Sequence, residues 1–132
     1  MAQEPVQWTF TTKKTADQQV EVHLLAKLKP GWHLYAGIQP ENAIAEPTKI
    51  VFMKNPLFRL SGGISEYGNK QLFENREVGI SAYQYEEQVD FVQLVLLRSK
   101  AKANIHGSIT YEVCTNEKCL PAKTIPFNLP LF

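Results

Sequence analysis

The strictest pattern in this chain is an alternation of apolar or small residues with polar ones near its C-terminal end. From Ala101 to Val113 every second residue is apolar or small, while the intervening residues, from Lys102 to Cys114, are mostly polar. Successive side chains of a β-strand point to opposite faces of the sheet. The pattern therefore predicts a long strand with one buried face, and it places Cys114 at the end of the polar face.

The rest of the chain also favours strands. Residues 6–10 and 20–28 alternate in the same way, and residues 50–53 form a short β-rich run. The segment from Phe91 to Leu97 has apolar residues on both faces of the expected strand, as in a central strand covered on two sides. No helical spacing of apolar residues is sustained over ten residues. Seven or eight short antiparallel strands fit a two-sheet sandwich better than a closed barrel. Residues 36–49 and 68–79 are expected to be loops.

Composition narrows the class of protein. The 132 residues suit a single domain, 1–132, which is large enough to build a core without cross-links. A net charge of +1 with scattered basic residues argues against nucleic acid as a partner. The longest apolar runs are far shorter than the roughly 20 residues that cross a bilayer, so no membrane contact is expected. The start, MAQEPVQW, has no basic or apolar leader segment, and we expect a secreted protein whose signal peptide has been removed.

The only two cysteines, Cys114 and Cys119, flank four turn-prone residues, Thr115 to Lys118. This arrangement predicts a strand, a tight loop and a second strand, with the cysteines about opposite each other. Opposed residues of an antiparallel pair have Cα atoms about 4.5 to 5.5 Å apart, which a disulfide accepts. The pair could be a structural brace, a redox disulfide or two metal ligands.

Magnitudes help to compare these alternatives. A disulfide that closes a loop of about six residues contributes only ~2 kcal/mol by chain entropy, which makes this pair a weak brace. Zinc needs four ligands, or three plus water, and the chain has only three histidines. His23 is expected on a solvated face, His33 is expected to pack against Trp32 or Tyr35, and His106 would lie about 27 Å along the strand from the first cysteine. A metal site is therefore the least favoured alternative, and no cofactor is expected.

The charges near the cysteines have opposing effects. Glu112 and Glu117 would raise the pKa of a nearby thiol, while Lys118 and Lys123 would lower it. A strongly activated thiolate is not indicated. A disulfide that a partner's thiolate opens needs no such activation, which makes a relay more plausible than an independent catalyst.

The chain resembles a known family in several of its motifs. These are GWHLY at residues 31–35, a Pro-containing stretch after it, a Gly-rich bend near Gly62, and G-x-I-x-Y-x-x-C-x4-C-L-P at residues 107–121. Together they resemble the N-terminal periplasmic domain of DsbD-type thiol:disulfide interchange proteins. The resemblance implies an all-β, immunoglobulin-like antiparallel β-sandwich and a periplasmic or otherwise extracytoplasmic location.

The resemblance also implies a function. In this family a thioredoxin-like domain reduces the disulfide of the N-terminal domain, and the resulting dithiol reduces periplasmic disulfide isomerases or cytochrome-maturation thioredoxins. By position, Cys114 and Cys119 would be the catalytic redox pair, and Cys119 would form the mixed disulfides. The alternative is a β-sandwich binding or adhesion module in which the same cysteine pair is an inert structural disulfide.

Further site residues follow from the resemblance. The family shields its disulfide with a mobile cap loop carrying an aromatic residue. Phe73 is the expected cap residue here, and Val78 is the choice if the register is counted back from Gly79. Tyr35 and Tyr111 are expected to line the cysteine site. Some family members have a longer spacer between the cysteines than the four residues present here, so the end of the hairpin is expected to differ in shape.

Overall fold

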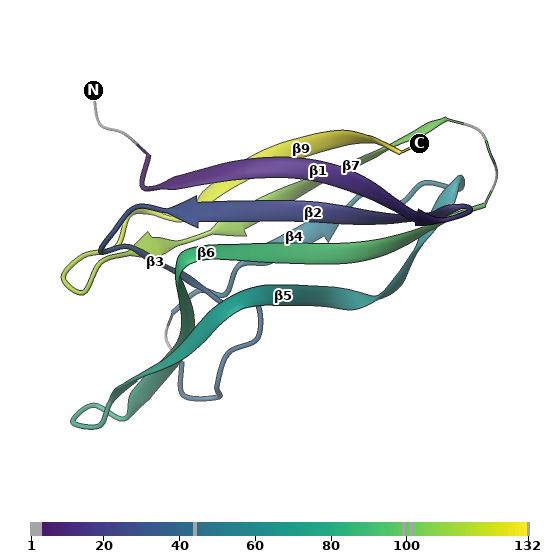
Figure 1. The fold of residues 1–132 in the computed structure, drawn as a ribbon. Helices are drawn as coiled ribbons and strands as arrows, with labels where there is room; N and C mark the ends of the chain where they lie inside the picture. Colours follow the sequence, from purple (N-terminus) through teal and green to yellow (C-terminus); the bar gives the residue numbers. More distant parts are fainter. Residues whose placement is uncertain (1–3, 44, 99, 101, 132) are drawn as a thin grey trace.

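The protein is a sandwich of two antiparallel sheets (Figure 1). The computed structural model describes residues 4–43, 45–98, 100 and 102–131. The regular elements in that part are all β-strands, and it contains no helix that could cross a membrane. The all-β sandwich expected from the sequence is therefore confirmed. The strands are β1 (Val6–Ala16), β2 (Gln19–Leu28), β3 (His33–Tyr35), β4 (Lys49–Phe52), β5 (Phe58–Asn75), β6 (Ile80–Leu97), β7 (Ala103–Tyr111), β8 (Val113–Cys114) and β9 (Lys123–Leu131).

The long strand β6 organises the larger, six-stranded sheet. It pairs with β5 along one edge, and along the other edge with β2 over residues 88–96 and then with β3 over residues 84–86. β1 lies outside β2, and β8 lies outside β3. Glu87 lies in β6 between the residues that pair with β2 and those that pair with β3, and its φ is 67°. Gly31, in the connection from β2 to β3, has a φ of 87°. Both breaks let the large sheet continue past the end of β2.

The core lies between the two sheets. In β2 the predicted alternation is confirmed, because Val20, Val22, Leu24 and Ala26 are each no more than 1% exposed. The smaller sheet, ordered β4-β7-β9, contributes Ile105 and other alternate residues of β7 to the same cluster. Burying such aliphatic side chains stabilises a fold by about 1.5–3 kcal/mol each. The period-2 pattern thus identifies the inward faces.

One predicted loop is wrong. Residues 68–79 were expected to form a loop, but β5 continues to Asn75 and β6 begins at Ile80, so only residues 76–79 form the turn. This hairpin projects beyond the sandwich in Figure 1, and most of its side chains on β5 are exposed on both faces. A two-stranded ribbon with two exposed faces needs no alternation of apolar and polar residues. The hydrophobic pattern therefore could not predict these strands. The expected loop at 36–49 is confirmed for the described residues up to Thr48; residue 44 lies outside them.

The strand count also differs from expectation. The described residues form nine strands, two of them 18 residues long, instead of seven or eight short ones. The predicted C-terminal strand begins at Ala103, and Ala101 lies outside the described residues.

Gly107 lies at a crowded point of β7, between β4 and β9. A Cβ atom added there would collide with the carbonyl oxygen of Val51 and with the ring of Phe127. The glycine that opens the C-terminal motif is thus required by close packing of the small sheet.

We expect Gly107→Ala to lower the free energy of unfolding by about 1–3 kcal/mol, the usual cost of overpacking. Urea denaturation measures this change. Gly63→Ala is the matched control, because a Cβ at Gly63 meets nothing within 4 Å. Equal losses in the two variants would contradict the steric explanation.

His23 is paired on the outer face of the large sheet, contrary to the expected solvated state. Its Nδ1 lies 2.8 Å from Asp90 Oδ2, and its Nε2 lies 3.0 Å from Glu21 Oε1. Partial burial favours the neutral ring, but the hydrogen bonds and charges of the two carboxylates outweigh it and raise the pKa of His23. The folded state therefore binds a proton at this site more tightly than the unfolded chain does.

Because the pKa is raised in the folded state, the stabilisation by His23 is fully present below the ordinary histidine pKa of about 6.5. It is lost as the pH rises through the folded-state pKa. We expect His23→Gln to reduce the free energy of unfolding more at about pH 5 than at about pH 8, as measured by urea denaturation. The difference should shrink in an Asp90→Asn background, and a loss independent of pH would refute the assignment.

Candidate functional site

The site is formed where the chain passes from one sheet to the other. β7 belongs to the small sheet and ends at Tyr111, Glu112 is in neither sheet, and β8 pairs with β3 of the large sheet. This break corrects the prediction of one straight strand ending in a polar face. Cys114 lies instead at the edge of the large sheet and is only 1% exposed.

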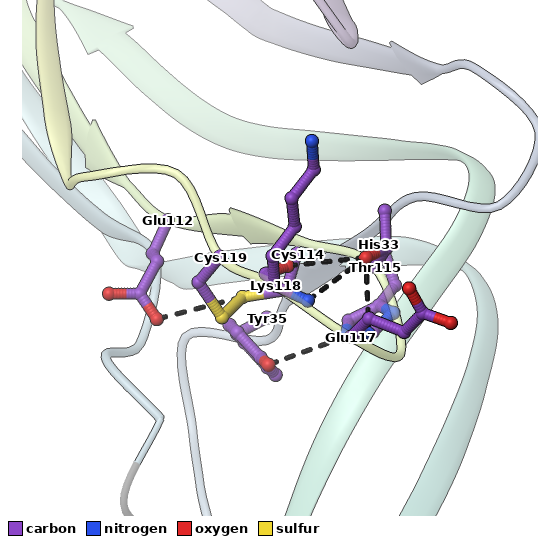
Figure 2. The surroundings of a disulfide bond; sticks show 8 residues. All are labelled: His33, Tyr35, Glu112, Cys114, Thr115, Glu117, Lys118 and Cys119. Carbon is purple, nitrogen blue, oxygen red and sulfur yellow. Dashed lines mark hydrogen bonds between the residues drawn. A yellow bond between two sulfur atoms is a disulfide. The ribbon is translucent and has the colours of Figure 1, made fainter.

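Cys114 and Cys119 form a disulfide and stand opposite each other, as the sequence predicts. Their Cα atoms are 4.0 Å apart, and they form an isolated antiparallel bridge. The two cysteines, whose disulfide is drawn in Figure 2, differ in burial, because residue Cys114 is buried and residue Cys119 is exposed. An attacking thiolate can therefore approach the Cys119 sulfur much more easily than the Cys114 sulfur.

The loop between the cysteines is held by its own hydrogen bonds. The Thr115 amide donates to the Lys118 carbonyl at 2.7 Å, and the Thr115 hydroxyl accepts from the amides of Glu117 and Lys118 at 3.2 and 3.1 Å. Beyond the loop, the Leu120 amide donates to the Val113 carbonyl at 3.0 Å. These bonds hold the cysteines opposite each other without help from the disulfide.

A hollow of about 290 Å³ lies beside the exposed sulfur. Its lining comes from three parts of the chain far apart in sequence, namely β3, the projecting β5–β6 hairpin and the cysteine loop. The lining residues are His33, Tyr35, Phe73, Gln84 and residues 115–119.

The structure brings together only some of the site residues expected from the sequence. Phe73 and Tyr35 line the hollow with Cys119. Val78 is 65% exposed, in the turn of the projecting hairpin, and is absent from the lining. Tyr111 is also absent from the lining and packs in the main core, where its ring meets that of Trp8 at 5.4 Å.

Tyr35 connects the hollow to the buried sulfur. It forms a small cluster with Ala82 and Cys114, and its hydroxyl shares a hydrogen bond of 3.3 Å with His33 Nε2. Burial, and then the negative charge of Glu112, raise the pKa of Tyr35, whereas burial lowers the pKa of His33. Both rings are therefore neutral near pH 7.

His33 and Gln84 also line this site, although neither was predicted from the sequence. His33 stands directly across from Cys114 in the β3–β8 pair, and Gln84 stands across from Tyr35 in the β3–β6 pair. The spacing of His33 and Tyr35, two residues apart in a strand, places their side chains on one face and could have indicated the first. Nothing in the local sequence indicated Gln84.

The Glu112 carboxylate lies beside the sulfur of Cys114. Its Oε1 lies 3.7 Å from Cys114 Sγ, as the dashed line in Figure 2 shows. A disulfide sulfur carries no proton, so in the oxidised protein this is a contact without a hydrogen bond. The contact becomes chemically relevant only when the disulfide opens.

The fold and the site together define a β-sandwich domain with an accessible disulfide in a hairpin at its sheet edge. A sequence model of the family "Thiol:disulfide interchange protein DsbD, N-terminal" matches residues 2–130. The chain belongs to this family of N-terminal domains of thiol:disulfide interchange proteins, and it has an immunoglobulin-like β-sandwich fold and a disulfide-bonded cysteine pair.

Comparisons of structure agree on the fold. The N-terminal periplasmic domain of ScsB from Proteus mirabilis is similar, with a TM-score of 0.66 and 22% identity over 96% of this chain; the chain spans only 47% of that structure. The reduced DsbD N-terminal domain from Neisseria meningitidis has a TM-score of 0.52 and 18% identity over 92% of this chain and 83% of its own. The yeast GGA1 GAE domain is similar in fold with only 7% identity, a TM-score of 0.52, and coverage of 98% of this chain and 96% of its own. No curated protein matches the sequence significantly.

Proposed function

We propose that this domain is an extracytoplasmic electron relay in which the Cys114–Cys119 disulfide is reversibly reduced. A thioredoxin-like domain would supply electrons, and periplasmic disulfide isomerases or cytochrome-maturation thioredoxins would receive them. The observation that carries the proposal is the pairing of an exposed residue, Cys119, which lines a hollow, with a buried residue, Cys114. The similar ScsB domain is periplasmic, and the similar DsbD domain has been solved in a reduced form, which supports the location and the redox chemistry.

The relay needs two thiol–disulfide exchanges in each direction. A donor thiolate attacks the Cys119 sulfur, the disulfide breaks, and Cys114 leaves with the electron pair and takes up a proton. The donor's second thiolate then attacks the mixed disulfide, so that the donor is oxidised and Cys119 is released as a thiolate. Running the same steps in reverse with an oxidised acceptor restores the original disulfide and passes on two electrons.

The hairpin of β5 and β6 provides a cap in this proposal. Phe73 lines the same hollow as Cys119 while remaining 46% exposed, so it is not a core residue. In this proposal its ring restricts access to the Cys119 sulfur through the hollow. The hairpin projects from the sandwich as a two-stranded ribbon, which leaves it free to swing when a partner enters (Figure 1).

We expect Phe73→Ala to speed the reaction of the disulfide with dithiothreitol roughly tenfold, equivalent to a barrier about 1.4 kcal/mol lower. Stopped-flow measurement of thiol release gives the rate. Leu72→Ala is the matched control, since Leu72 is equally exposed at 49% on the same strand but does not line the hollow. An unchanged rate in folded Phe73→Ala would move the cap to Val78, or remove it if Val78→Ala is also silent.

A trapping experiment tests the relay itself. In Cys114→Ala, the remaining Cys119 is activated as a mixed disulfide with a small aromatic thiol and offered to a thioredoxin-like protein that lacks its second cysteine. We expect rapid capture through Cys119, because its sulfur is exposed. Cys119→Ala, activated likewise at the buried Cys114, should capture the partner at least about tenfold more slowly.

Non-reducing electrophoresis and mass spectrometry of the captured complex measure both outcomes. Equal capture through the two cysteines would contradict the assigned asymmetry. Absence of capture through either would favour the alternative, a binding module with an inert disulfide. Such a disulfide would also resist glutathione, with a reduction potential below about −300 mV.

A further inference from the structure

Three potential metal ligands meet at the cysteine hairpin. One carboxylate oxygen of Glu112 and the sulfur atoms of Cys114 and Cys119 all lie within 4.8 Å of one another. Thiolate sulfur and carboxylate oxygen are both ligands that Zn²⁺ accepts, and zinc sites with three protein ligands complete a tetrahedron with water. The ligand set therefore suits zinc better than copper(I), which selects soft sulfur ligands.

The redox state decides whether these ligands are available. In the disulfide each sulfur is bonded to the other, and neither can act as a thiolate ligand. A reductant that supplies two electrons and two protons converts the bond into two thiols, whose sulfur atoms then move apart. Two Zn–S bonds of about 2.3 Å at a tetrahedral angle need sulfur atoms about 3.7 Å apart, which is an ordinary separation for non-bonded sulfurs.

The hairpin holds the ligands in place after reduction. The hydrogen bonds of Thr115 and the bond from Leu120 to Val113 keep the two cysteines opposite each other, with Cα atoms 4.0 Å apart in the present state. Glu112 is half-buried at the crossing between the sheets, and its Oε1 already touches Cys114 Sγ at 3.7 Å. Little chain entropy is lost on binding, because the ligands are already ordered.

The surrounding charges favour a cation. Glu117 and Lys118 both line the adjacent hollow, and the amino group of Lys118 lies over the ring of Trp32, 5.9 Å from its centroid, where the ring partly satisfies its charge. Lys123 is paired with Glu4 at 2.8 Å. Cys119 faces solvent, which leaves an open side for the water ligand.

We propose that the reduced domain binds one Zn²⁺ through Cys114, Cys119 and Glu112, with water as fourth ligand, and that the oxidised domain does not. Binding would release the two thiol protons. The ion would protect the dithiol from acceptors, so that zinc regulates the same site that carries out the interchange. This inference rests on the proposed function only in requiring that the disulfide can be opened.

The first test compares the two redox states of the whole chain. The domain is reduced with a phosphine, freed of reductant without oxygen, and titrated with Zn²⁺ against a chromophoric chelator. We expect one ion per reduced chain and none per oxidised chain. Co²⁺ used in place of Zn²⁺ should show the charge-transfer absorption of thiolate ligands. Failure of the reduced chain to bind, or equal binding by the oxidised chain, would overturn the proposal.

The second test concerns Glu112. Glu112→Gln should weaken zinc binding by the reduced domain about tenfold or more, since loss of even a supporting partner of a metal ligand costs 10–100-fold. Glu117→Gln is the matched control, because it removes a carboxylate from the same hairpin that is not among the three ligands. Equal weakening by the two changes would show that only general charge acts, and would remove Glu112 from the site. Circular dichroism confirms that each variant is folded.

The third test is the reduction potential. At a free Zn²⁺ concentration about 100 times Kd, the dithiol is favoured about 100-fold, which is a rise of about 59 mV for a two-electron couple. No shift would contradict metal binding at the cysteines. Capture of a thioredoxin-like partner in zinc-free buffer tests the proposed function separately, so the two ideas can fail independently.

Discussion

The two-residue pairing of β8 with β3 is the interaction on which the site depends. This pairing brings the chain from the small sheet into the large sheet and places Cys114 across from His33. Glu112 lies where the chain passes between the two sheets. The neighbouring pair, Leu34 and Val113, is almost fully buried, with 0% and 3% exposure. Burial of these two apolar side chains contributes about 1.5–3 kcal/mol each. A short strand with only two paired residues is thus anchored by the core beneath it.

The same arrangement separates redox chemistry from folding. The disulfide closes a loop that the Thr115 hydrogen bonds already close, and its entropic contribution is only about 2 kcal/mol. Small domains are stable by about 5–15 kcal/mol, so a domain with this core can lose the bond and remain folded. In the proposed relay the disulfide opens in every cycle, and a short hairpin suits this role, since reducing a bond that braced distant strands would cost the fold more stability.

The sequence predicted what periodicity and short-range chemistry control. The inward face of β2, the all-β class and the opposed cysteines were all predicted correctly, because alternation and a four-residue turn are local signals. The projecting hairpin at residues 68–79 was missed, since an exposed ribbon has no apolar face. The crossing at Glu112 was missed as well, because the alternation of side chains continues through it while the partner strand changes. Gln84 depends on long-range pairing that no local pattern contains.

The electrostatics of the site support the proposal that a partner supplies the reactive thiolate. The buried Cys114 sulfur lies beside the Glu112 carboxylate, and both of these surroundings disfavour a thiolate. The rings of His33 and Tyr35 are neutral near pH 7 because burial lowers the pKa of the first and raises that of the second. Lys118 is held over Trp32. None of these groups supplies a positive charge to the buried sulfur, so negative charge in the reduced state is favoured on the solvated Cys119. In the proposed relay, attack at Cys119 is therefore favoured by access and not by charge, because a thiol that is disfavoured as thiolate leaves more slowly, and the partner must supply the reactive thiolate.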